Sequence, residues 1–412
     1  MKILVVADRF FPNAPGGLAR VAWDVAKALV RRGHTVHLVA AELTSDAVLD
    51  FATMVDGVHV HLFSRPVFSA WHPRRMGVPV ALFARTVGNV LAQEQFDAIH
   101  FHSIYTGMAV LRAIRGRVSR PGLVYTIHSP VAQEQRVNWS RQGFLGVVNN
   151  IIGLPLVRRL ERKLILSADA THVLSHFSAD ELAKEHPRLT GRYRVIPHFV
   201  YHDWGRHLPQ QDARARLGWP LHAKTLFTVR RLAYRYGIDD AIAAVAPLAA
   251  AGRCVLRIAG DGPDRQQLQR IIDGHGCSDT ITLMGQVTDE TLQLAYRAAN
   301  LFLLPTRQLE CFGLISLEAM SLGLPVLGTS VGAIPEVIRP ILPEFLTPPG
   351  NPTAFRDKVE AYLDGRLEPP SEEVIVRYVQ DTYSELSIMA RYEKMYEDVL
   401  TARAGNIAGG RA

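Results

Sequence analysis

The stretch from Asn300 to Leu327 constrains the fold most, because its pattern changes from strand to helix and back to strand. An apolar run of strand length begins at Asn300 and ends at Pro305. A helix pattern follows and closes at Gly323, and the next apolar run starts another strand. In such a unit the helix N-terminus faces the carboxyl edge of a parallel sheet, where its free N–H groups favour a phosphate. The stretch therefore predicts an α/β fold with an anion site beside this helix.

Two glutamates bracket a Phe-Gly turn at the start of that helix. Glu310 lies in the loop before the turn, and Glu318 lies two turns into the helix. Carboxylates are poor phosphate ligands, but they accept hydrogen bonds from sugar hydroxyls. A nucleotide-sugar diphosphate, which carries two sugars, would use both features. A helix with one Glu in its first turns is also common for structural reasons, so spacing alone leaves that second explanation open.

Length and composition indicate a globular protein of two or three domains. The chain has 412 residues, of which 48% are hydrophobic and 21% charged, so each domain can bury its own core. No apolar run has the length of a bilayer span, and Asp8 and Arg9 come too early for a signal peptide, so we expect a cytoplasmic protein. Cys254, Cys277 and Cys311 form no metal or redox spacing, and we expect reduced thiols.

Positive charge is concentrated in the first half of the chain. Residues 1–205 contain 24 Lys and Arg against 15 Asp and Glu, whereas the remainder contains 22 against 24. A basic half favours an anionic partner, such as a phosphorylated or lipid-linked acceptor or the inner face of a membrane. A solvated basic face explains the excess equally well. No nucleic acid partner is expected.

The first half begins with a βαβ pattern. Residues 3–7 predict a strand, Ala19 to Arg32 a helix, and Thr35 to Ala40 the next strand. Gly16 and Gly17 therefore fall at the strand-to-helix turn, where a backbone could approach a phosphate closely. Two adjacent glycines also fit an ordinary turn, so this signal is weak.

Three later stretches of the first half are further candidates for function. Leu123 to Ile127 predicts a strand that places His128 at the carboxyl edge of a sheet, either as a ligand contact or as a capping residue. Residues 144–166 predict an amphipathic helix that lies on a membrane surface or packs on its own domain. The loop from Trp71 to Met76 is aromatic and basic and could contact an acceptor or a lipid head group.

A second α/β half follows a polar linker. Thr225 to Val229 predicts its first strand, Gly237 to Ala251 its first helix, and Gly252 to Ala259 echoes residues 33–40. We therefore predict two Rossmann-like domains, at residues 1–197 and 211–385, with a linker at residues 198–210. A C-terminal helix at residues 386–403 and a flexible tail at residues 404–412 complete the predicted organisation.

Several ordered motifs closely resemble the retaining family-4 glycosyltransferases of the GT-B fold (glycosyl transferases group 1). The motifs are Val229-Arg230-Arg231-Leu232, Ala259-Gly260-Asp261-Gly262-Pro263, Leu283-Met284-Gly285-Gln286-Val287, Pro305-Thr306, Glu310-Cys311-Phe312-Gly313 through Glu318-Ala319-Met320, Gly323-Leu324-Pro325-Val326 and Gly332-Ala333-Ile334-Pro335-Glu336. The likeness spans nearly the whole chain. It implies two Rossmann-like domains that face each other across a cleft, with the C-terminal helix returning to the first domain, and a hexosyltransferase activity.

The resemblance also implies roles for individual residues. Glu310 matches the first glutamate of the family's paired motif, which holds hydroxyls of the donor sugar, and Glu318 matches the second, which binds the nucleotide ribose. Arg231 matches the arginine that neutralises the departing diphosphate. His128 falls where the first domain offers a histidine to the donor sugar, so Glu310, His128 and Arg231 are the implied catalytic residues. The other implied donor-binding positions are Gly16, Gly17, Arg235, Gly262, Val287, Phe312, Gly313 and Leu314.

The chain departs from the family pattern in two places. Tyr236 stands where a lysine usually precedes Gly237, so one expected phosphate cation is missing. Arg235 is adjacent and could replace it, because a guanidinium pairs well with phosphate oxygens. His198-Phe199 stands where Asn-Gly is usual after the linker strand, which affects the expected local backbone and not the reaction class.

The expected reaction is transfer with retention from a nucleotide-sugar diphosphate to an acceptor hydroxyl, in the biosynthesis of a glycan, glycolipid or glycosylated metabolite. Negative charge grows on the departing diphosphate, so cations and N–H donors on the leaving group are the useful catalysts. No Asp-x-Asp occurs in the sequence, so we expect neither a metal clamp nor a cofactor. A UDP-sugar is the first expectation for the donor, and GDP-mannose is the second.

Three other classes of protein compete with this interpretation. The first is a sugar phosphorylase or nucleotide-sugar epimerase of the same architecture. A phosphorylase would need a pyridoxal lysine or a second phosphate site, and the sequence has no motif for either. A non-catalytic nucleotide-sugar-binding subunit of a glycosylation complex stays open because of Tyr236. A dinucleotide-dependent oxidoreductase is disfavoured, because no Gly-x-Gly-x-x-Gly follows the first strand.

Overall fold

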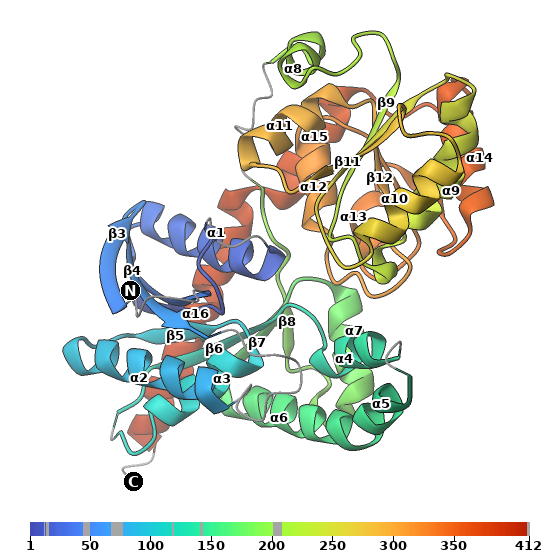
Figure 1. The fold of residues 1–412 in the computed structure, drawn as a ribbon. Helices are drawn as coiled ribbons and strands as arrows, with labels where there is room; N and C mark the ends of the chain where they lie inside the picture. The colour runs from blue at the N-terminus through green and yellow to red at the C-terminus, as the bar shows by residue number, and fades with distance from the viewer. Residues whose placement is uncertain are drawn as a thin grey trace. The chain divides into compact units, whose positions relative to one another are not determined.

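Residues 1–11, 13, 16–43, 50–66, 77–117, 119–140, 143–200 and 208–409 are described by a computed structural model of the chain. The chain divides into two units (Figure 1). Unit 1 contains Met1–His198 and Glu385–Ala412, and unit 2 contains Phe199–Ser384. The predicted loop from Trp71 to Met76 lies outside the described residues, as do residues 201–207 of the predicted linker.

Unit 1 is built on an eight-stranded sheet with the order β3-β4-β2-β1-β5-β6-β7-β8. β3 pairs antiparallel with β4, and the other neighbours pair in parallel. The strands are β1 (Lys2–Val6), β2 (Thr35–Leu43), β3 (Asp50–Val55), β4 (Val58–Arg65), β5 (Ala98–Phe101), β6 (Gly122–Ile127), β7 (Ala170–Val173) and β8 (Tyr193–Val195). The apolar run from Ile3 to Val6 is fully buried, as expected for a central parallel strand that is covered on both faces.

Helices of unit 1 connect these strands. They are α1 (Gly17–Arg31), α2 (Gly77–Gln93), α3 (Ile104–Ala113), α4 (Val131–Trp139), α5 (Gly143–Val148), the π-helical η1 (Asn149–Gly153), α6 (Leu154–Ser167), α7 (His176–Glu185), the 3-10 helix η2 (Pro187–Leu189) and α16 (Glu385–Gly409). The helix predicted over residues 144–166 is confirmed as an unbroken helical stretch, in which the π-helical η1 joins α5 to α6. Two residues distinguish the junction between η1 and α6. Pro155 lacks an N–H for helical hydrogen bonding, and Gly153 lies close to the Trp139 ring, since an added Cβ would be 2.9 Å from it.

The C-terminal helix α16 belongs to unit 1 and extends past residue 403. Glu385 at its start pairs with Arg31 at 2.7 Å, and Asp398 pairs with Arg194 at 2.7 Å. Gly122 at the start of β6 allows a close approach, because an added Cβ would lie 2.5 Å from a methyl group of Val399. The helix therefore packs directly on the sheet of unit 1.

Unit 2 contains a six-stranded parallel sheet with the order β11-β10-β9-β12-β13-β14. This is the strand order of the Rossmann fold. The strands are β9 (Thr225–Val229), β10 (Val255–Ala259), β11 (Ile281–Gly285), β12 (Leu301–Leu304), β13 (Val326–Thr329) and β14 (Leu346–Thr347). The predicted first strand of this half is confirmed as β9, and the predicted strand–loop–helix–strand unit is confirmed with β12 and β13 as its strands.

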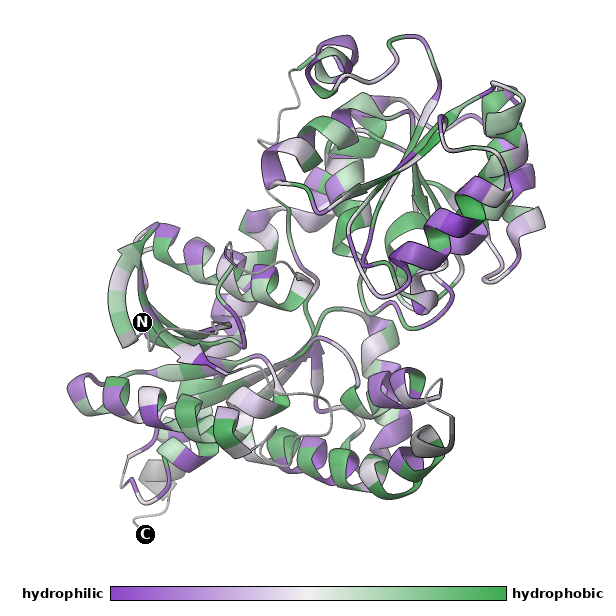
Figure 2. Cartoon of the chain, viewed as in Figure 1, coloured by the Kyte–Doolittle hydropathy of each residue, from purple (hydrophilic) through white to green (hydrophobic). Residues whose placement is uncertain are grey.

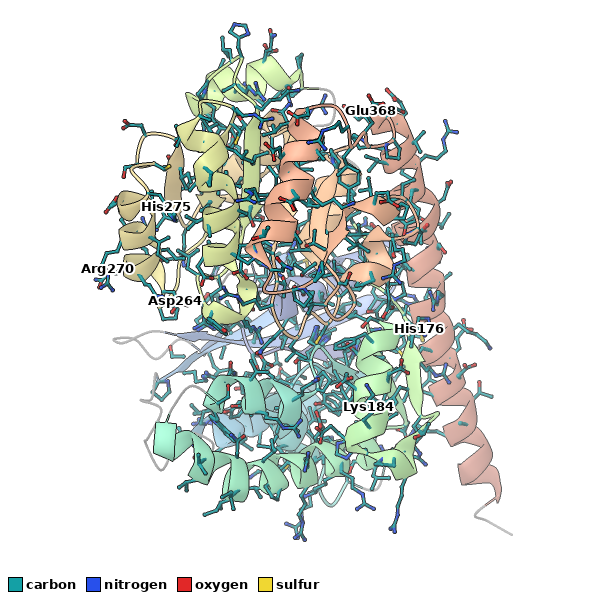
Figure 3. The ribbon with its side chains drawn as sticks, turned by 90° about the vertical axis from the view of Figure 1, so that its right-hand side faces the viewer. His176, Lys184, Asp264, Arg270, His275 and Glu368 are labelled. Atoms are coloured by element: carbon teal, nitrogen blue, oxygen red, sulfur yellow. The ribbon has the colours of Figure 1, made fainter. Side chains whose placement is uncertain are left out.

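Helices cover the unit 2 sheet. They are α8 (Gln210–Leu217), the 3-10 helix η3 (Tyr234–Tyr236), α9 (Ile238–Ala250), α10 (Arg265–Gly274), α11 (Asp289–Ala298), α12 (Leu314–Ser321), α13 (Ile334–Ile338), the 3-10 helix η4 (Pro343–Phe345), α14 (Pro352–Leu363) and α15 (Glu372–Tyr383). Arg270 on α10 and His275 directly after it have exposed side chains at the surface (Figure 3).

Hydrophobic residues concentrate on the strands and the inner helix faces of each unit (Figure 2). The three cysteines are buried and no disulfide joins them, which agrees with the predicted thiols. Among the residues that the structure describes, no helix is both long and apolar enough to cross a membrane.

Candidate functional site

The carboxyl ends of β9 and β12 hold the centre of the candidate site. These strands are neighbours in the sheet, although β10 and β11 lie between them in the chain. The strand order reverses at this pair, and such a switch point leaves a crevice outside the carboxyl ends of the strands. Arg230 and Arg231 follow β9, and Pro305 and Thr306 follow β12. Two of the motifs found in the sequence therefore meet at this edge.

Glu310 lies on a firmly held loop between β12 and α12. Leu309 has a φ of 53° and Gly313 a φ of 83°, so the loop turns through the left-handed region on both sides of Glu310. The Glu310 carbonyl accepts a hydrogen bond from the Ala333 N–H at 2.8 Å. Gly332 packs against the same peptide, since an added Cβ would lie 2.1 Å from the Glu310 carbonyl oxygen. The loop after β13 therefore fixes the backbone of Glu310.

The Glu310 carboxylate pairs with Arg230, a residue that the sequence analysis did not assign to the site. Arg230 Nη2 donates to Glu310 Oε2 and also to Thr306 Oγ1, the latter at 2.9 Å. The paired side chains of Arg230 and Glu310 are only 11% and 12% exposed. Glu310 Oε1 has no hydrogen-bond partner among the described residues, and it is not buried. This second oxygen is therefore available to a ligand hydroxyl.

Arg231 differs from its neighbour in its surroundings. Its side chain is exposed, and no hydrogen bond or ion pair engages its guanidinium within the part of the chain that the structure describes. A free guanidinium at a strand end is well suited to a phosphate, because its donors match phosphate oxygens in pairs. In the sequence, Arg230 and Arg231 both follow the apolar run that forms β9. This position alone could not show which of the two arginines pairs with Glu310.

Tyr236 stands in the position of the expected lysine, and two guanidinium groups lie close to its ring. The guanidinium carbons of Arg230 and Arg235 are 4.6 and 4.7 Å from the centroid of its ring. Arg235 also donates a hydrogen bond to the Tyr236 hydroxyl at 2.5 Å. Arg235 is thus engaged with Tyr236 in the structure, and its contact with a phosphate stays a prediction.

Arg307 attaches the loop after β12 to the start of α9. It donates to both carboxylate oxygens of Asp240, at 2.6 and 2.5 Å, and pairs with Asp239 at 2.8 Å. Burial lowers the pKa of Arg307, but the hydrogen bond with Asp240 and the charges of both aspartates outweigh burial and raise the pKa above its ordinary value. Gly237 permits this approach, because an added Cβ would lie 2.0 Å from the Pro305 carbonyl oxygen. Arg307 is therefore a structural cation.

Glu318 lies inside α12 with only 6% of its surface exposed. The Tyr296 hydroxyl on α11 donates to Glu318 Oε2 at 2.9 Å. Tyr296 therefore orients the carboxylate, an anchor that the sequence spacing could not show. Phe312 is also buried, and its ring packs against the ring of Tyr383. α12 begins at Leu314, and Gly313 before it provides no side-chain cap.

The loops after β10 and β11 adjoin the same edge. An added Cβ on Gly260 would lie 1.9 Å from the Arg230 carbonyl oxygen, and one on Gly262 would lie 2.2 Å from that of Leu232. These two glycines therefore let the loop after β10 pack against the loop that carries Arg230. Val287 follows β11 and is partly exposed. The structure thus gathers the predicted residues of unit 2 at neighbouring strand ends of one sheet.

Gly16, Gly17 and His128 belong to unit 1. Gly16 precedes α1 with a φ of 143°, and nothing lies within 4 Å of the point where a Cβ would be added. His128 follows β6 directly, at the carboxyl edge where the sequence placed it. Burial, together with repulsion from His172 and His198, lowers the pKa of His128 to about 3.

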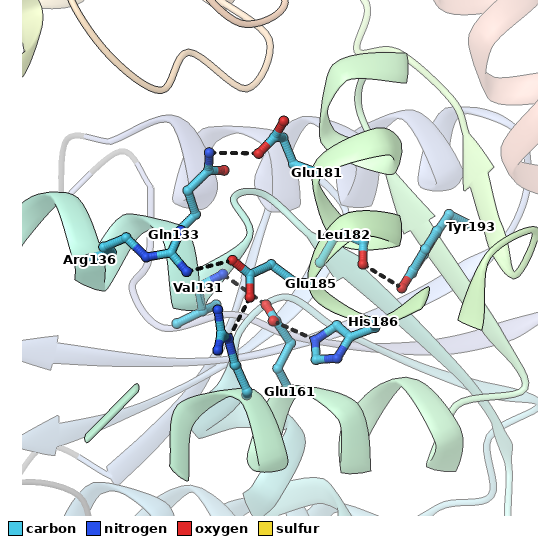
Figure 4. Close-up of polar contacts among 10 residues, drawn as sticks. Val131, Gln133, Arg136, Glu161, Glu181, Leu182, Glu185, His186 and Tyr193 are labelled. Carbon is cyan, nitrogen blue, oxygen red and sulfur yellow. Dashed lines mark hydrogen bonds and ion pairs between the residues drawn. The ribbon is translucent and has the colours of Figure 1, made fainter. Parts of the chain in front are cut away.

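Polar contacts from α6 and α7 hold α4, the helix that begins just after His128 (Figure 4). The fully buried Glu161 accepts a hydrogen bond from the Val131 N–H at 2.8 Å and pairs with His186 at 3.0 Å. Two further contacts join the same helices, from Gln133 to Glu181 and from Arg136 to Glu185. The strand-end loop that carries His128 is therefore anchored on its C-terminal side.

A directed chain of hydrogen bonds joins α16 to three strands of unit 1. His172 Nε2 donates to the Ile196 carbonyl at 2.7 Å, and burial lowers the pKa of His172 to about 4, so its Nδ1 carries no proton at neutral pH. The Thr126 hydroxyl must then donate to this Nδ1, at 2.8 Å, and accept from His100 Nε2, at 2.6 Å. Burial also lowers the pKa of His100, so its Nδ1 accepts from the Tyr396 hydroxyl at 2.7 Å.

Two family models match the chain. The model described as Glycosyltransferase Family 4 matches residues 15–204, and the one described as Glycosyl transferases group 1 matches residues 209–381. The chain is a family 4 glycosyltransferase. The resemblance found in its motifs is therefore confirmed, and so is the expectation of a transferase enzyme.

Curated relatives of this glycosyltransferase cover nearly its full length. The gpi3 subunit of phosphatidylinositol N-acetylglucosaminyltransferase from Schizosaccharomyces pombe is 23% identical over 96% of this chain and 80% of its own. The N-acetyl-α-D-glucosaminyl L-malate synthase of Bacillus anthracis is 24% identical over 93% of this chain and 94% of its own.

Solved structures share the fold of this glycosyltransferase. The sucrose-phosphate synthase of Thermosynechococcus elongatus superposes with a TM-score of 0.79 at 20% identity, over 97% of this chain and 99% of that one. HepE of Anabaena, solved with UDP and glucose, gives 0.73 at 18% identity, over 97% and 100%. The predicted GT-B fold with two Rossmann-like sheets is confirmed.

Proposed function

We propose that this glycosyltransferase moves a hexose, with retention and without a metal ion, from a UDP-sugar to a hydroxyl of an anionic acceptor. One observation carries the proposal. Glu310 is fixed by its backbone, has one carboxylate oxygen paired with Arg230, and leaves the other oxygen open, while Arg231 follows the same strand as Arg230 with a guanidinium that has no partner among the described residues. A site of this kind combines an acceptor for sugar hydroxyls with a cation for a leaving phosphate.

Each group of the site then has a chemical task. Glu310 Oε1 accepts a hydrogen bond from a hydroxyl of the donor sugar, while Arg230 orients the carboxylate through its contact with Oε2. Arg231 and the free N–H groups at the start of α12 stabilise the charge that grows on the departing diphosphate. Glu318, oriented by Tyr296, accepts from the nucleotide ribose.

The bond changes balance without a covalent enzyme intermediate. The bond from the anomeric carbon to the diphosphate oxygen breaks, and its electron pair leaves with the diphosphate. The acceptor oxygen attacks the same face of the sugar through an oxocarbenium-like state. Its proton passes to the departing phosphate oxygen, so no side chain needs to act as a base. The configuration at the anomeric carbon is thereby retained.

Support for a UDP-sugar and an anionic acceptor comes from the similar proteins. HepE of Anabaena was solved with UDP and glucose. This supports a UDP-sugar as the first choice of donor and leaves GDP-mannose as the second. The two curated relatives are named for phosphatidylinositol and for L-malate, and both of these carry negative charge. The basic first half of this chain suits such an acceptor.

The first test is a thermal-shift panel of UDP, GDP, ADP and their sugar conjugates, with and without EDTA. A ligand that binds only the folded state stabilises it and so raises the melting temperature. At a concentration of 100 times the Kd, this stabilisation is about 2.7 kcal/mol. We expect UDP and one UDP-sugar to give the shift, with EDTA making no difference.

The nucleotide sugar that shifts the melting temperature is then used for transfer assays, and the anomeric configuration of the product is read by proton NMR. A shift that EDTA removes would contradict metal independence, and an inverted product would contradict retention. Binding without any transfer or hydrolysis would favour the non-catalytic subunit instead.

We also propose that unit 1 binds an anionic membrane surface through η1 and the helices beside it. Five large hydrophobic side chains are exposed in this short stretch: Val147, Ile151, Ile152, Leu156 and Leu166. Within residues 143–167 the only acidic residue is Glu161, which is buried, whereas Arg159, Arg162 and Lys163 are exposed. An exposed apolar strip flanked by cations is the pattern of a helix that lies in the head-group region of a membrane.

Vesicle flotation tests this membrane surface. We expect the protein to bind vesicles that contain phosphatidylglycerol more strongly than vesicles of phosphatidylcholine alone. Replacing Ile151 and Ile152, which are 68% and 70% exposed, by serine should lower binding by about tenfold or more, since each buried isoleucine contributes about 1.5–3 kcal/mol. Leu221→Ser, at an exposed leucine of unit 2, is the matched control. Equal binding by the double variant and the parent would refute the proposal.

A further inference from the structure

His102 lies next to His128 at the carboxyl edge of the unit 1 sheet. β5 ends just before His102, β6 ends just before His128, and these strands are neighbours. His102 Nδ1 and His128 Nε2 are 3.0 Å apart, which is a hydrogen-bond distance. His102 is only 1% exposed. Its other nitrogen, Nε2, is buried and has no hydrogen-bond partner among the described residues.

Both rings are neutral at physiological pH. Burial, reinforced by neighbouring histidines, lowers the pKa of His102 well below its ordinary value and lowers that of His128 to about 3. A neutral imidazole carries one proton, on one nitrogen or the other. The hydrogen bond between the two rings therefore has two arrangements, which differ in the ring that donates.

The buried Nε2 atom of His102 decides between them. If His128 donated, His102 would carry its proton on Nε2, and a buried N–H would have no acceptor. If His102 donates from Nδ1, only a lone pair is left unpartnered. Buried N–H groups without an acceptor are rarer in native structures than under-satisfied acceptors, so the second arrangement is favoured.

We propose that His102 is a positioning residue whose Nδ1–H donates to Nε2 of His128 and so presents the Nδ1–H of His128 as a hydrogen-bond donor for a bound ligand. The Nδ1 atom of His128 is not buried, and it has no partner within the described part of the chain. The lone pair of His128 is occupied by His102, so His128 cannot take a proton from the ligand. It offers one N–H to an oxygen atom instead.

This inference deepens the proposed function and rests on it where the ligand is concerned. If His128 contacts the donor sugar, the contact is an N–H donated to a hydroxyl oxygen, and not general-base catalysis. The arrangement agrees with a mechanism in which the departing phosphate takes the acceptor proton. The tautomer itself is a property of the free protein and can be measured without any ligand.

Long-range proton–nitrogen NMR correlations of the full-length, histidine-labelled protein test the tautomer directly. His128→Gln identifies the His128 signals by their loss. We expect a protonated Nδ1 and an unprotonated Nε2 for His128 at neutral pH, with no titration between about pH 5 and pH 8 because its pKa lies far below this range. His102→Leu should shift His128 toward the Nε2–H form, and His102→Asn, whose amide can still donate, should keep part of the Nδ1–H form. His275→Gln, at an exposed histidine of unit 2, should change nothing.

A protonated Nε2 on His128 in the parent protein overturns the inference, whatever the activity. An unchanged His128 signal in a folded His102→Leu protein overturns it as well, and if that variant does not fold, the parent spectrum alone decides. In transfer assays, His102→Leu should raise KM for the donor about fivefold through the loss of one oriented hydrogen bond. If the spectra are as expected but His128→Gln transfers sugar normally, the tautomer stands and the proposed contact of His128 with the donor fails.

Discussion

Replacing Arg231 by Ala is expected to lower kcat for sugar transfer by about 10²–10³-fold, which corresponds to about 2.7–4 kcal/mol of lost transition-state stabilisation. The guanidinium is exposed and unpartnered in the described structure, so its removal breaks no internal contact. Negative charge on the diphosphate is greatest when the sugar bond has broken, and a positioned cation lowers the energy of that state more than that of the bound substrate. Steady-state kinetics with the donor from the thermal-shift panel provides the measurement.

Two companion variants separate catalysis from other effects of charge removal. Arg270→Ala removes an exposed arginine from α10 of the same unit and should leave kcat unchanged (Figure 3). Arg231→Lys keeps the charge but loses the paired donors, so it should recover only part of the lost rate. All three variants should melt at the parent temperature. A fully active Arg231→Ala protein would refute the role given to this residue.

The strands of the site could be predicted from the sequence because they are parallel and buried. A strand covered on both faces is apolar at every position, so β9 and β12 appear as short apolar runs that end at charged residues or proline. β3 was not predicted, because it is an edge strand and is not buried on both faces. Its exposed hydrophobic side chains, such as Phe51 and Met54, leave no pattern of burial in the sequence.

The partners of the site residues could not be predicted, because they come from distant parts of the chain. Arg230 and Glu310 are 80 residues apart in sequence, and Tyr296 and Glu318 are joined through side chains of two different helices. Spacing within one helix or loop carries no information about such contacts. The sequence located His128 at a strand end, but its pairing with His102 follows from the neighbouring positions of β5 and β6, which no local pattern specifies.

The buried histidines of unit 1 should make its stability depend steeply on pH. Burial lowers the pKa values of His37, His100, His102, His128 and His172 below the value of about 6.5 for an unfolded chain. As the pH falls through 6.5, the unfolded chain therefore binds protons that the folded chain does not. The stability is fully present above this pH and is lost below it.

Unfolding by urea, followed by limited proteolysis and mass spectrometry to assign fragments to each unit, measures this effect. Five such histidines should together cost unit 1 about 7 kcal/mol between about pH 7.5 and pH 5.5, a large part of the 5–15 kcal/mol that stabilises a typical domain. Unit 2 is an internal reference, because its described histidines, His222 and His275, are exposed. His172→Gln keeps a donor for the Ile196 carbonyl and removes one titrating group, so it should reduce the slope below pH 6.5 by about 1.4 kcal/mol per pH unit. Equal pH dependence of the two units would contradict the neutral, hydrogen-bonded arrangement of these rings, because charged histidines in the fold would leave no difference in proton binding.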